Sequence, residues 1–294
     1  MTTAPPAGFL ARWRARAEAT SRLAVGMGPS AERLDWWGLP DTLAAARDHA
    51  LTVADAVADR VSLVKIQTPF FERFGGPGLG LLREVVDRVH EGGALVVLDA
   101  KRCDAPDVAD TLAGLYLGPD SVLGGDAVTL VPWMGLAPLE PALTEAGRRN
   151  CGILLMTRTS NHASDTVQHA RDTAGRTVGQ ALADEAAAWN RAHRTDHLGA
   201  VVGARPDEAR DLVARTGTGL VSLPGLGRPG RTPENVVAAA GDHLDRAVFP
   251  VTSGLLRHGR RHLAASLTGW TLAVRDACDA REPAHRPAEE RTAS

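Results

Sequence analysis

Short apolar runs rich in β-branched residues alternate along this chain with amphipathic stretches of helical period. We expect strands at eight such runs, which cover residues 23–27, 62–67, 94–101, 127–133, 152–159, 198–204, 219–225 and 247–253. Between them apolar residues recur every three or four positions, which predicts helices over 42–61, 80–93, 137–150, 177–195, 205–217 and 232–244. The strand runs are almost continuously apolar, as is typical of strands that are buried on both faces.

The order of these elements predicts the fold class. Strand followed by helix, repeated eight times, is typical of an α/β fold of the (β/α)8 TIM-barrel type, with an open doubly wound sheet as the alternative. No linker or change of composition divides the chain. We therefore expect an N-terminal helical extension over 1–20, a single barrel domain over 21–281 that ends in a helix near 260–280, and a disordered tail over 282–294.

Composition narrows the class of protein. The chain has 294 residues, of which 44% are hydrophobic, so it can bury one large core. Its formal net charge of −2 argues against a nucleic-acid partner. No apolar run approaches the ~18 residues of a membrane span, and the N-terminus lacks the apolar segment of a signal peptide. Cys103, Cys151 and Cys278 show no metal-ligand or disulfide spacing, and we expect a cytoplasmic protein without a membrane partner.

Charged residues gather where the third predicted strand ends, in the stretch LVVLDAKRCDAP (95–106). Asp99 and Lys101 are two positions apart, so side-chain alternation places them on the same side of the strand, and Asp104 follows. Lys65 ends the neighbouring strand, and the chain contains no lysines besides Lys65 and Lys101. Barrel enzymes carry their chemistry at the C-terminal ends of strands, and lysine can release a proton where arginine cannot. A structural ion-pair network is the alternative, but such charges are costly to desolvate without a use, so we favour a catalytic array.

Several motifs together resemble those of the orotidine 5'-monophosphate decarboxylase family, in its longer bacterial form, over nearly the whole chain. DAKRCD is similar to the family's Asp-x-Lys-x-x-Asp signature, and VKIQTPFFERFGGPGL (64–79) is similar to the segment that carries its other active-site lysine. Four further stretches match in order: WGLPD (37–41), RTSN (158–161), VVGA (201–204) and PGLG (224–227).

The resemblance implies a reaction and a role for each charged residue. The family removes CO2 from C6 of a pyrimidine without a metal or an organic cofactor. Asp99 would then lie against the departing carboxylate, and Lys101 would stabilise the developing negative charge and protonate the carbon. Lys65 and Asp104 would complete an array of alternating sign. The family also implies a homodimer with active sites at the interface, in which Asp104 comes from the partner subunit.

The substrate-binding positions depart from the family pattern. Gly28 replaces an Asp that helps to hold ribose, and Val131 replaces a Ser that contacts the pyrimidine. Pro229 replaces a Gln and Ser253 an Arg, both of which bind phosphate in the family. Val108 also replaces a Thr that reaches the neighbouring subunit's ligand.

A charge-assisted hydrogen bond contributes about 1.5–3 kcal/mol, so these losses together weaken substrate binding substantially. They favour a cofactor-independent carboxy-lyase with an altered, unphosphorylated substrate, either pyrimidine nucleoside-like or another heterocyclic carboxylate of secondary metabolism. Two alternatives stay open. In the first, the chain is a genuine orotidine 5'-monophosphate decarboxylase whose phosphate site is rebuilt with Arg228 or Arg231. In the second, it is a diverged barrel that either has aldolase- or epimerase-type chemistry or only binds a ligand.

The remaining candidates are substrate-binding residues at the ends of the later strands. They are Val131, Trp133, Ser160, Asn161, Arg228, Arg231 and Ser253. Trp133 replaces a family Tyr and packs either on a flat substrate ring or in the core. His162 is either a ligand contact or a loop residue. Cys103 stands where the family has Gly, and we interpret it as a small space-filling residue rather than a nucleophile.

Overall fold

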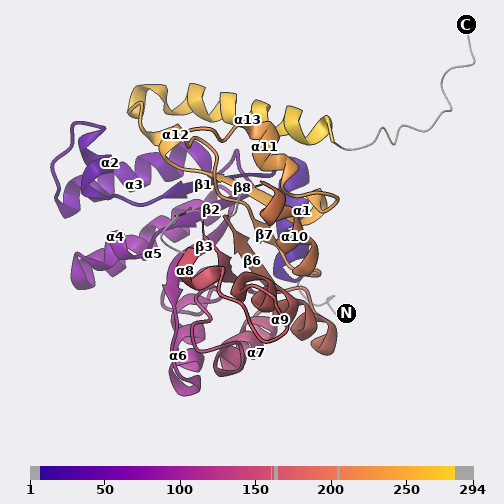
Figure 1. The fold of residues 1–294 in the computed structure, drawn as a ribbon. Coiled ribbons are helices and arrows are strands. Elements are labelled where there is room, and N and C mark those ends of the chain that lie inside the picture. Colours follow the sequence, from indigo (N-terminus) through magenta and orange to yellow (C-terminus); the bar gives the residue numbers. More distant parts are fainter. Residues whose placement is uncertain (1–6, 160, 162–164, 204–205, 282–294) are drawn as a thin grey trace, which may run out of the picture.

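Eight parallel strands close into a barrel in the computed structural model, which describes residues 7–159, 161, 165–203 and 206–281 (Figure 1). The strands follow one another around the barrel in chain order, and β1 pairs with β8. They are β1 (Leu23–Met27), β2 (Leu63–Ile66), β3 (Leu95–Arg102), β4 (Ala127–Leu130), β5 (Gly152–Arg158), β6 (Leu198–Val202), β7 (Val221–Ser222) and β8 (Ala247–Val251). The predicted TIM barrel is confirmed, and the open doubly wound sheet is wrong.

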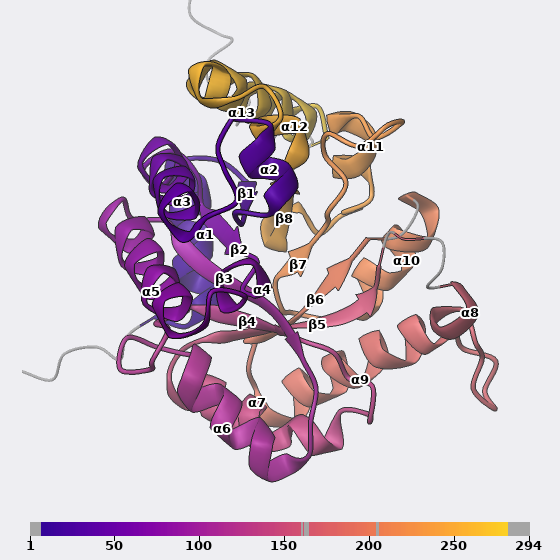
Figure 2. The same cartoon turned by 90° about the vertical axis from the view of Figure 1, so that its left-hand side faces the viewer.

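Helices surround this barrel on the outside (Figure 2). They are α1 (Phe9–Ala19), α2 (Ala31–Asp35), α3 (Leu43–Val57), α4 (Pro69–Glu72), α5 (Gly75–Glu91), α6 (Pro106–Tyr116), α7 (Glu140–Arg148), α8 (Asp165–Gln168), α9 (Val178–His193), α10 (Pro206–Arg215), α11 (Pro233–Ala238), α12 (Ser253–Leu256) and α13 (Leu263–Asp279). Thr42, Thr177 and Thr232 cap three of them, each accepting a hydrogen bond from a backbone N–H of the first turn. Among the described residues, no helix is both long enough and apolar enough to cross a membrane.

Two strands, β4 and β7, are much shorter than the apolar runs that predicted them. β4 ends at Leu130, and β7 contains two residues where the sequence predicts 219–225. Pro132 and Pro224 follow these strands, and proline has no N–H to donate to a neighbouring strand. The proline positions therefore set where the sheet stops and the loops of the barrel mouth begin.

Side-chain alternation divides each strand into an inner and an outer row. Leu63, Leu95, Val97 and Leu154 belong to an apolar cluster inside the barrel, whereas their chain neighbours pack under the surrounding helices. Lys65 and Asp99 continue the inner rows of β2 and β3. The barrel thus directs both side chains into its interior, at the C-terminal ends of the strands.

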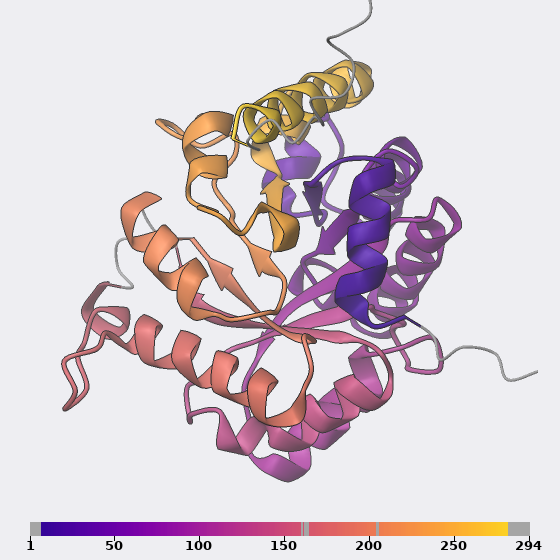
Figure 3. The same cartoon turned by 90° about the vertical axis from the view of Figure 1, so that its right-hand side faces the viewer.

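Helix α1 closes the opposite end of the barrel. Its Phe9, Leu10 and Trp13 are buried in the same inner cluster, and Figure 3 shows the helix lying across that end. Arg12 forms an ion pair with Asp126, whose other oxygen accepts a hydrogen bond from the backbone N–H of Val96 at 2.9 Å. One end of the barrel is therefore filled by apolar side chains, whereas the inner rows of β2 and β3 end in charged residues at the other.

Candidate active site

The carboxylate of Asp99 binds two ammonium groups at once. Its Oδ2 lies 2.6 Å from Nζ of Lys65, and its Oδ1 lies 2.5 Å from Nζ of Lys101. Asp99 is almost fully buried, Lys65 is mostly buried, and 45% of the Lys101 side chain is exposed. The three residues therefore form a continuous ion-pair chain that runs from the barrel interior to its mouth.

Thr129 of β4 fixes the Asp99 end of this chain. Its hydroxyl donates a hydrogen bond to Oδ1 of Asp99 at 3.0 Å and accepts one from the backbone N–H of Lys101, also at 3.0 Å. Lys101 itself has a left-handed backbone, with φ of +48°. Such a conformation costs an L residue about 1–2 kcal/mol. The sequence predicted that simple strand alternation would bring Lys101 beside Asp99, but the contact is made through this turn of the backbone.

The electrostatics of the three groups are coupled. Burial acts to raise the pKa of Asp99, but the two neighbouring ammonium groups outweigh it and hold the pKa of this carboxyl well below its usual range. Burial lowers the pKa of Lys65, which Asp99 opposes and the positive charge of Lys101 reinforces. The array thus places one permanent carboxylate between two lysine side chains, of which the buried Lys65 has a lowered pKa.

A cavity of about 250 Å3 opens above the array. All three charged residues line it, together with residues from the ends of several strands, which are Gln67, Met156, Thr159, Asn161, Val201, Ser222, Pro224 and Arg228. Charged and amide groups thus lie beside apolar ones, an arrangement typical of sites for small molecules.

The structure brings some of the predicted site residues together and leaves others apart. Asn161 and Arg228 line the cavity, as the sequence suggested. Asp104 does not, since it is exposed and its Oδ1 accepts a hydrogen bond from the neighbouring N–H of Ala105 at 2.8 Å.

Four further candidates, Val131, Trp133, Arg231 and Ser253, also lie outside the cavity lining. Trp133 is 71% exposed, so it neither packs in the core nor covers this cavity within one chain. Ser160 and His162 lie outside the described residues.

The structure leaves no space for a side chain at Gly28. A Cβ on this residue would lie 2.6 Å from Cδ2 of Phe70, closer than real side chains approach. Nη1 of Arg33 donates hydrogen bonds to the carbonyl oxygen of Gly28 at 2.8 Å and to Oε1 of Gln67 at 2.7 Å. The space that a side chain at position 28 would need is therefore taken by Phe70, Gln67 and Arg33, of which Gln67 also lines the cavity.

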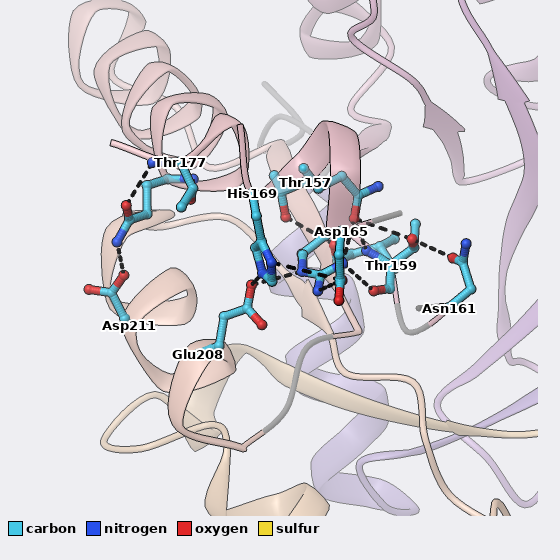
Figure 4. A network of polar contacts seen from close by, with 12 residues as sticks. Thr157, Thr159, Asn161, Asp165, His169, Thr177, Glu208 and Asp211 are labelled. Atoms are coloured by element: carbon cyan, nitrogen blue, oxygen red, sulfur yellow. Dashed lines mark hydrogen bonds and ion pairs between the residues drawn. The ribbon is translucent and has the colours of Figure 1, made fainter. Parts of the chain in front are cut away.

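Arg158, at the end of β5, belongs to a network of polar contacts, and Figure 4 labels Thr159, Asn161, Asp165 and Glu208 in this network. This buried guanidinium donates hydrogen bonds to Glu208 of α10 at 2.7 Å and to Asp165 of α8 at 2.5 Å. It also donates to the carbonyl oxygen of Thr159 at 3.1 Å, and the Thr159 hydroxyl donates to Oδ1 of Asn161 at 2.5 Å. A single arginine therefore joins two helices to the strand end that presents Thr159 and Asn161.

The donor set at the site does not suit a metal ion. Both carboxylate oxygens of Asp99 already accept hydrogen bonds from ammonium groups. Within the described ranges, no group of three His, Cys, Asp or Glu side chains is arranged to hold a metal. The described side chains around the signature aspartate therefore do not form a suitable set of metal ligands.

Sequence reasoning missed several lining residues, among them Gln67, Thr159 and Ser222. Gln67 and Thr159 end their predicted strands, and Ser222 is the last residue of the observed β7, where a barrel places its functional groups. Met156 and Val201 lie on the inner rows of β5 and β6. Strand parity therefore identifies Gln67, Met156, Val201 and Ser222, whereas Thr159 follows a register shift in β5 and departs from it.

Comparison with known proteins gives consistent matches. Residues 23–244 match the profile of the orotidine 5'-phosphate decarboxylase / HUMPS family. The orotidine 5'-phosphate decarboxylase of Streptomyces coelicolor is 37% identical over 254 residues, covering 85% of this chain and 90% of the relative. That of Myxococcus xanthus is 38% identical over 234 residues, covering 78% of this chain and 81% of the relative.

Solved structures agree with these sequence matches. The Leishmania donovani OMP decarboxylase superimposes with a TM-score of 0.76 at 27% identity, covering 92% of this chain and 98% of that one. A Streptomyces avermitilis structure, described as a proposed orotidine 5'-phosphate decarboxylase, gives a TM-score of 0.87 at 33% identity over 95% of this chain and 99% of that one.

We expect Asp99→Asn to lower the free energy of unfolding by about 3–5 kcal/mol at neutral pH, because it leaves two ammonium groups without their shared counter-charge. Lys101→Met is the matched control, since it leaves the Lys65–Asp99 pair intact and should change stability much less. Urea denaturation of both variants measures the difference. The pKa of Asp99 is lowered by folding, so the loss is complete above about pH 5 and shrinks as the pH falls below the ordinary aspartate pKa of about 4. Equal stability of the two variants at pH 7 would contradict this account.

Proposed function

The chain belongs to the orotidine 5'-phosphate decarboxylase / HUMPS family, and on this premise we propose that it converts orotidine 5'-monophosphate to the uridine nucleotide and CO2. Curated relatives at 34–38% identity carry the decarboxylase name, which makes the chain a carbon–carbon lyase similar to those enzymes. The observation that carries the proposal is the Lys65–Asp99–Lys101 array at the base of a cavity that accommodates a small molecule.

The array suits a reaction in which negative charge appears on carbon. The bond between C6 and its carboxylate breaks, CO2 leaves, and the electron pair stays on C6. The ammonium of Lys101 then donates a proton to C6, and the neutral amine regains one from water. Because Asp99 already holds both ammonium groups, little reorganisation is needed when the charge develops. Asp99 also disfavours the substrate carboxylate beside it, and this repulsion is relieved as CO2 departs.

Arg228 is the candidate for the phosphate contact. It is an exposed residue of the loop after β7 and lines the cavity that contains the charged array. A guanidinium can bind phosphate through two parallel hydrogen bonds, as the family's lost arginine would have done. We assign this role to Arg228 rather than Arg231, because the side chain of Arg231 does not line the cavity.

A second candidate function is decarboxylation of an altered substrate that lacks phosphate. The specific observation in its favour is the corner at Gly28, where Phe70 and Gln67 occupy the space of a family side chain. The charged array would serve such a carboxylate equally well, since it contacts only the reacting end. The relatives' names favour the first candidate, and a direct assay distinguishes the two.

We further propose that the enzyme is a homodimer in which Asp104 acts on the partner's array. Asp104 is exposed and lies outside its own chain's cavity, although it belongs to the signature that carries Asp99 and Lys101. Trp133 and Met134 are both large apolar residues that are exposed in the single chain, at 71% and 49%. Such residues on one surface are typical of a protein interface.

The purified protein should decarboxylate orotidine 5'-monophosphate in the presence of EDTA, followed by the loss of orotate absorbance and by CO2 release. Lys101→Ala should lower kcat by about 10²–10⁴-fold, because it removes the proton donor. The surface variant Arg47→Met, which breaks an ion pair with Glu84, is the control and should retain activity. A wild-type protein that is folded but inactive on this substrate, yet decarboxylates unphosphorylated orotidine, would favour the second candidate.

Arg228→Ala should raise KM for orotidine 5'-monophosphate about 10- to 100-fold, because it removes the charge-assisted hydrogen bonds between the guanidinium and the phosphate. The same change should have little effect on the reaction of unphosphorylated orotidine, measured as kcat/KM. Arg231→Ala serves as the matched control in the same loop. A similar loss in both variants, or an equal loss with both substrates, would rule out a phosphate contact by Arg228.

Subunit mixing tests whether Asp104 acts in the partner's site. Lys101→Ala and Asp104→Ala should each be nearly inactive alone. When equal amounts are unfolded and refolded together, half of the dimers are mixed and each has one intact site, so about a quarter of the wild-type activity should return. No recovery from a mixture that sedimentation shows to be dimeric would indicate that Asp104 acts within its own chain or not at all.

A further inference from the structure

The ion pair with Asp99 holds only the end of the Lys101 side chain, so it does not by itself explain the left-handed backbone of this residue. Lys101 is one of three residues other than glycine with positive φ in the described part of the chain. It lies inside β3, where the pairing with β4 shifts register between Leu98 and Arg102. Such a conformation persists only where the surrounding structure holds it. The residues that hold it are therefore expected directly beside Lys101, and not only at its side-chain end.

Arg102, the next residue, is held at both its side chain and its backbone. Its Nη2 lies 2.8 Å from Oε2 of Glu72, and its Nε donates a hydrogen bond to the hydroxyl of Tyr116 at 3.1 Å. Its carbonyl oxygen accepts a hydrogen bond from the backbone N–H of Val131 at 2.8 Å. The backbone that follows Lys101 is thereby tied to three separate parts of the barrel rim.

The two side chains that bind Arg102 are themselves fixed. Glu72 ends helix α4, and its second oxygen accepts a hydrogen bond from the hydroxyl of the fully buried Thr68 at 2.7 Å. Tyr116 ends helix α6, is fully buried, and is the only tyrosine in the chain. Neither residue lines the active-site cavity. Their contacts with Arg102 therefore serve the shape of the rim rather than substrate binding.

We propose that Glu72, Arg102 and Tyr116 form a clamp that positions Lys101 for proton transfer. By fixing Arg102, the clamp keeps the Lys101 backbone left-handed and its ammonium group on Asp99. The three are positioning residues, because they act through Lys101. The inference rests on the proposed function for its catalytic consequence, but the geometric part can be measured without any turnover.

The lysine content of the chain makes a direct test possible. Protein labelled with ¹³C and ¹⁵N in lysine should give two sets of side-chain signals, from Lys65 and Lys101, which Lys101→Met assigns. The readouts are the NMR order parameters of the Cε–H bonds and the rate at which the ammonium protons exchange with water. In Arg102→Met, Glu72→Gln and Tyr116→Phe, the Lys101 side chain should become more mobile, and its ammonium protons should exchange faster with water. The Lys65 signal, whose residue does not touch the clamp, is the internal reference.

Kinetics provides the second readout. Misplacement of a reacting group by about 1 Å can lower a rate by about 100-fold, so each clamp variant should lower kcat by about 10- to 100-fold and leave KM nearly unchanged. Tyr116→Phe removes only a hydroxyl and keeps the aromatic core, so it remains informative if Arg102→Met fails to fold. Arg47→Met, which removes a comparable ion pair elsewhere, should change neither readout.

The outcomes separate the clamp from the proposed reaction. A mobile Lys101 in the variants, together with wild-type protein that turns over no orotidine derivative, would support the clamp and overturn the proposed function. An unchanged Lys101 signal in folded Tyr116→Phe and Glu72→Gln would overturn the clamp, whatever the activity. A rise in KM with kcat retained would also overturn it, because it would place these residues in substrate binding.

Discussion

The structure depends on one carboxylate that neutralises two ammonium groups inside a barrel. Asp99 is buried at 4% exposure, and without it Lys65 and Lys101 would face each other across a space that water enters only from one side. A buried ion pair is weak as a source of stability, because desolvation offsets most of the attraction. Its value here is that three charges stand in fixed positions before any substrate arrives. The fold supplies that fixed arrangement through the inner rows of β2 and β3 and through Thr129 on β4.

The two ends of the barrel have opposite chemistry for a physical reason. At one end, α1 fills the interior with Phe9, Leu10 and Trp13, so the strands are held by apolar packing that needs no precise geometry at the mouth. At the other end the prolines after β4 and β7 stop the sheet early and release loops that carry Arg228 and Trp133. Stability and function are thus separated along the barrel axis, and loops at the mouth can change without loss of the core.

The sequence predicted the barrel because it contains eight almost uninterrupted apolar runs. Few folds other than a barrel accommodate eight such buried strands in a chain of this length. Lys65 and Asp99 were predictable for the same reason, since parity along a buried strand is a local property. The position of Lys101 was predicted for an incomplete reason. Its left-handed backbone depends on Glu72 and Tyr116, which are distant in sequence, and no local pattern reports such a contact. Gln67 and Ser222 were missed because glutamine and serine at strand ends have no pattern of their own, and the short β7 reflects Pro224 rather than hydrophobicity.

The charged array and the cavity wall have different parts in the proposed reaction, and this difference bears on how the substrate specificity of such an enzyme can change. In the proposed reaction the array touches only the reacting carbon and carboxylate, so its electrostatic effect is the same for any acid held in the same place. Under the same proposal, recognition depends on single side chains at the rim, where Arg33 and Phe70 fill the space beside Gly28 and Gln67 lines the cavity. Binding energy from these remote contacts determines how much of the array's stabilisation is realised in the transition state. Under the proposed function, such an enzyme keeps its charged centre while contacts at the rim change, provided that a contact such as the one proposed for Arg228 holds the reacting bond against Asp99.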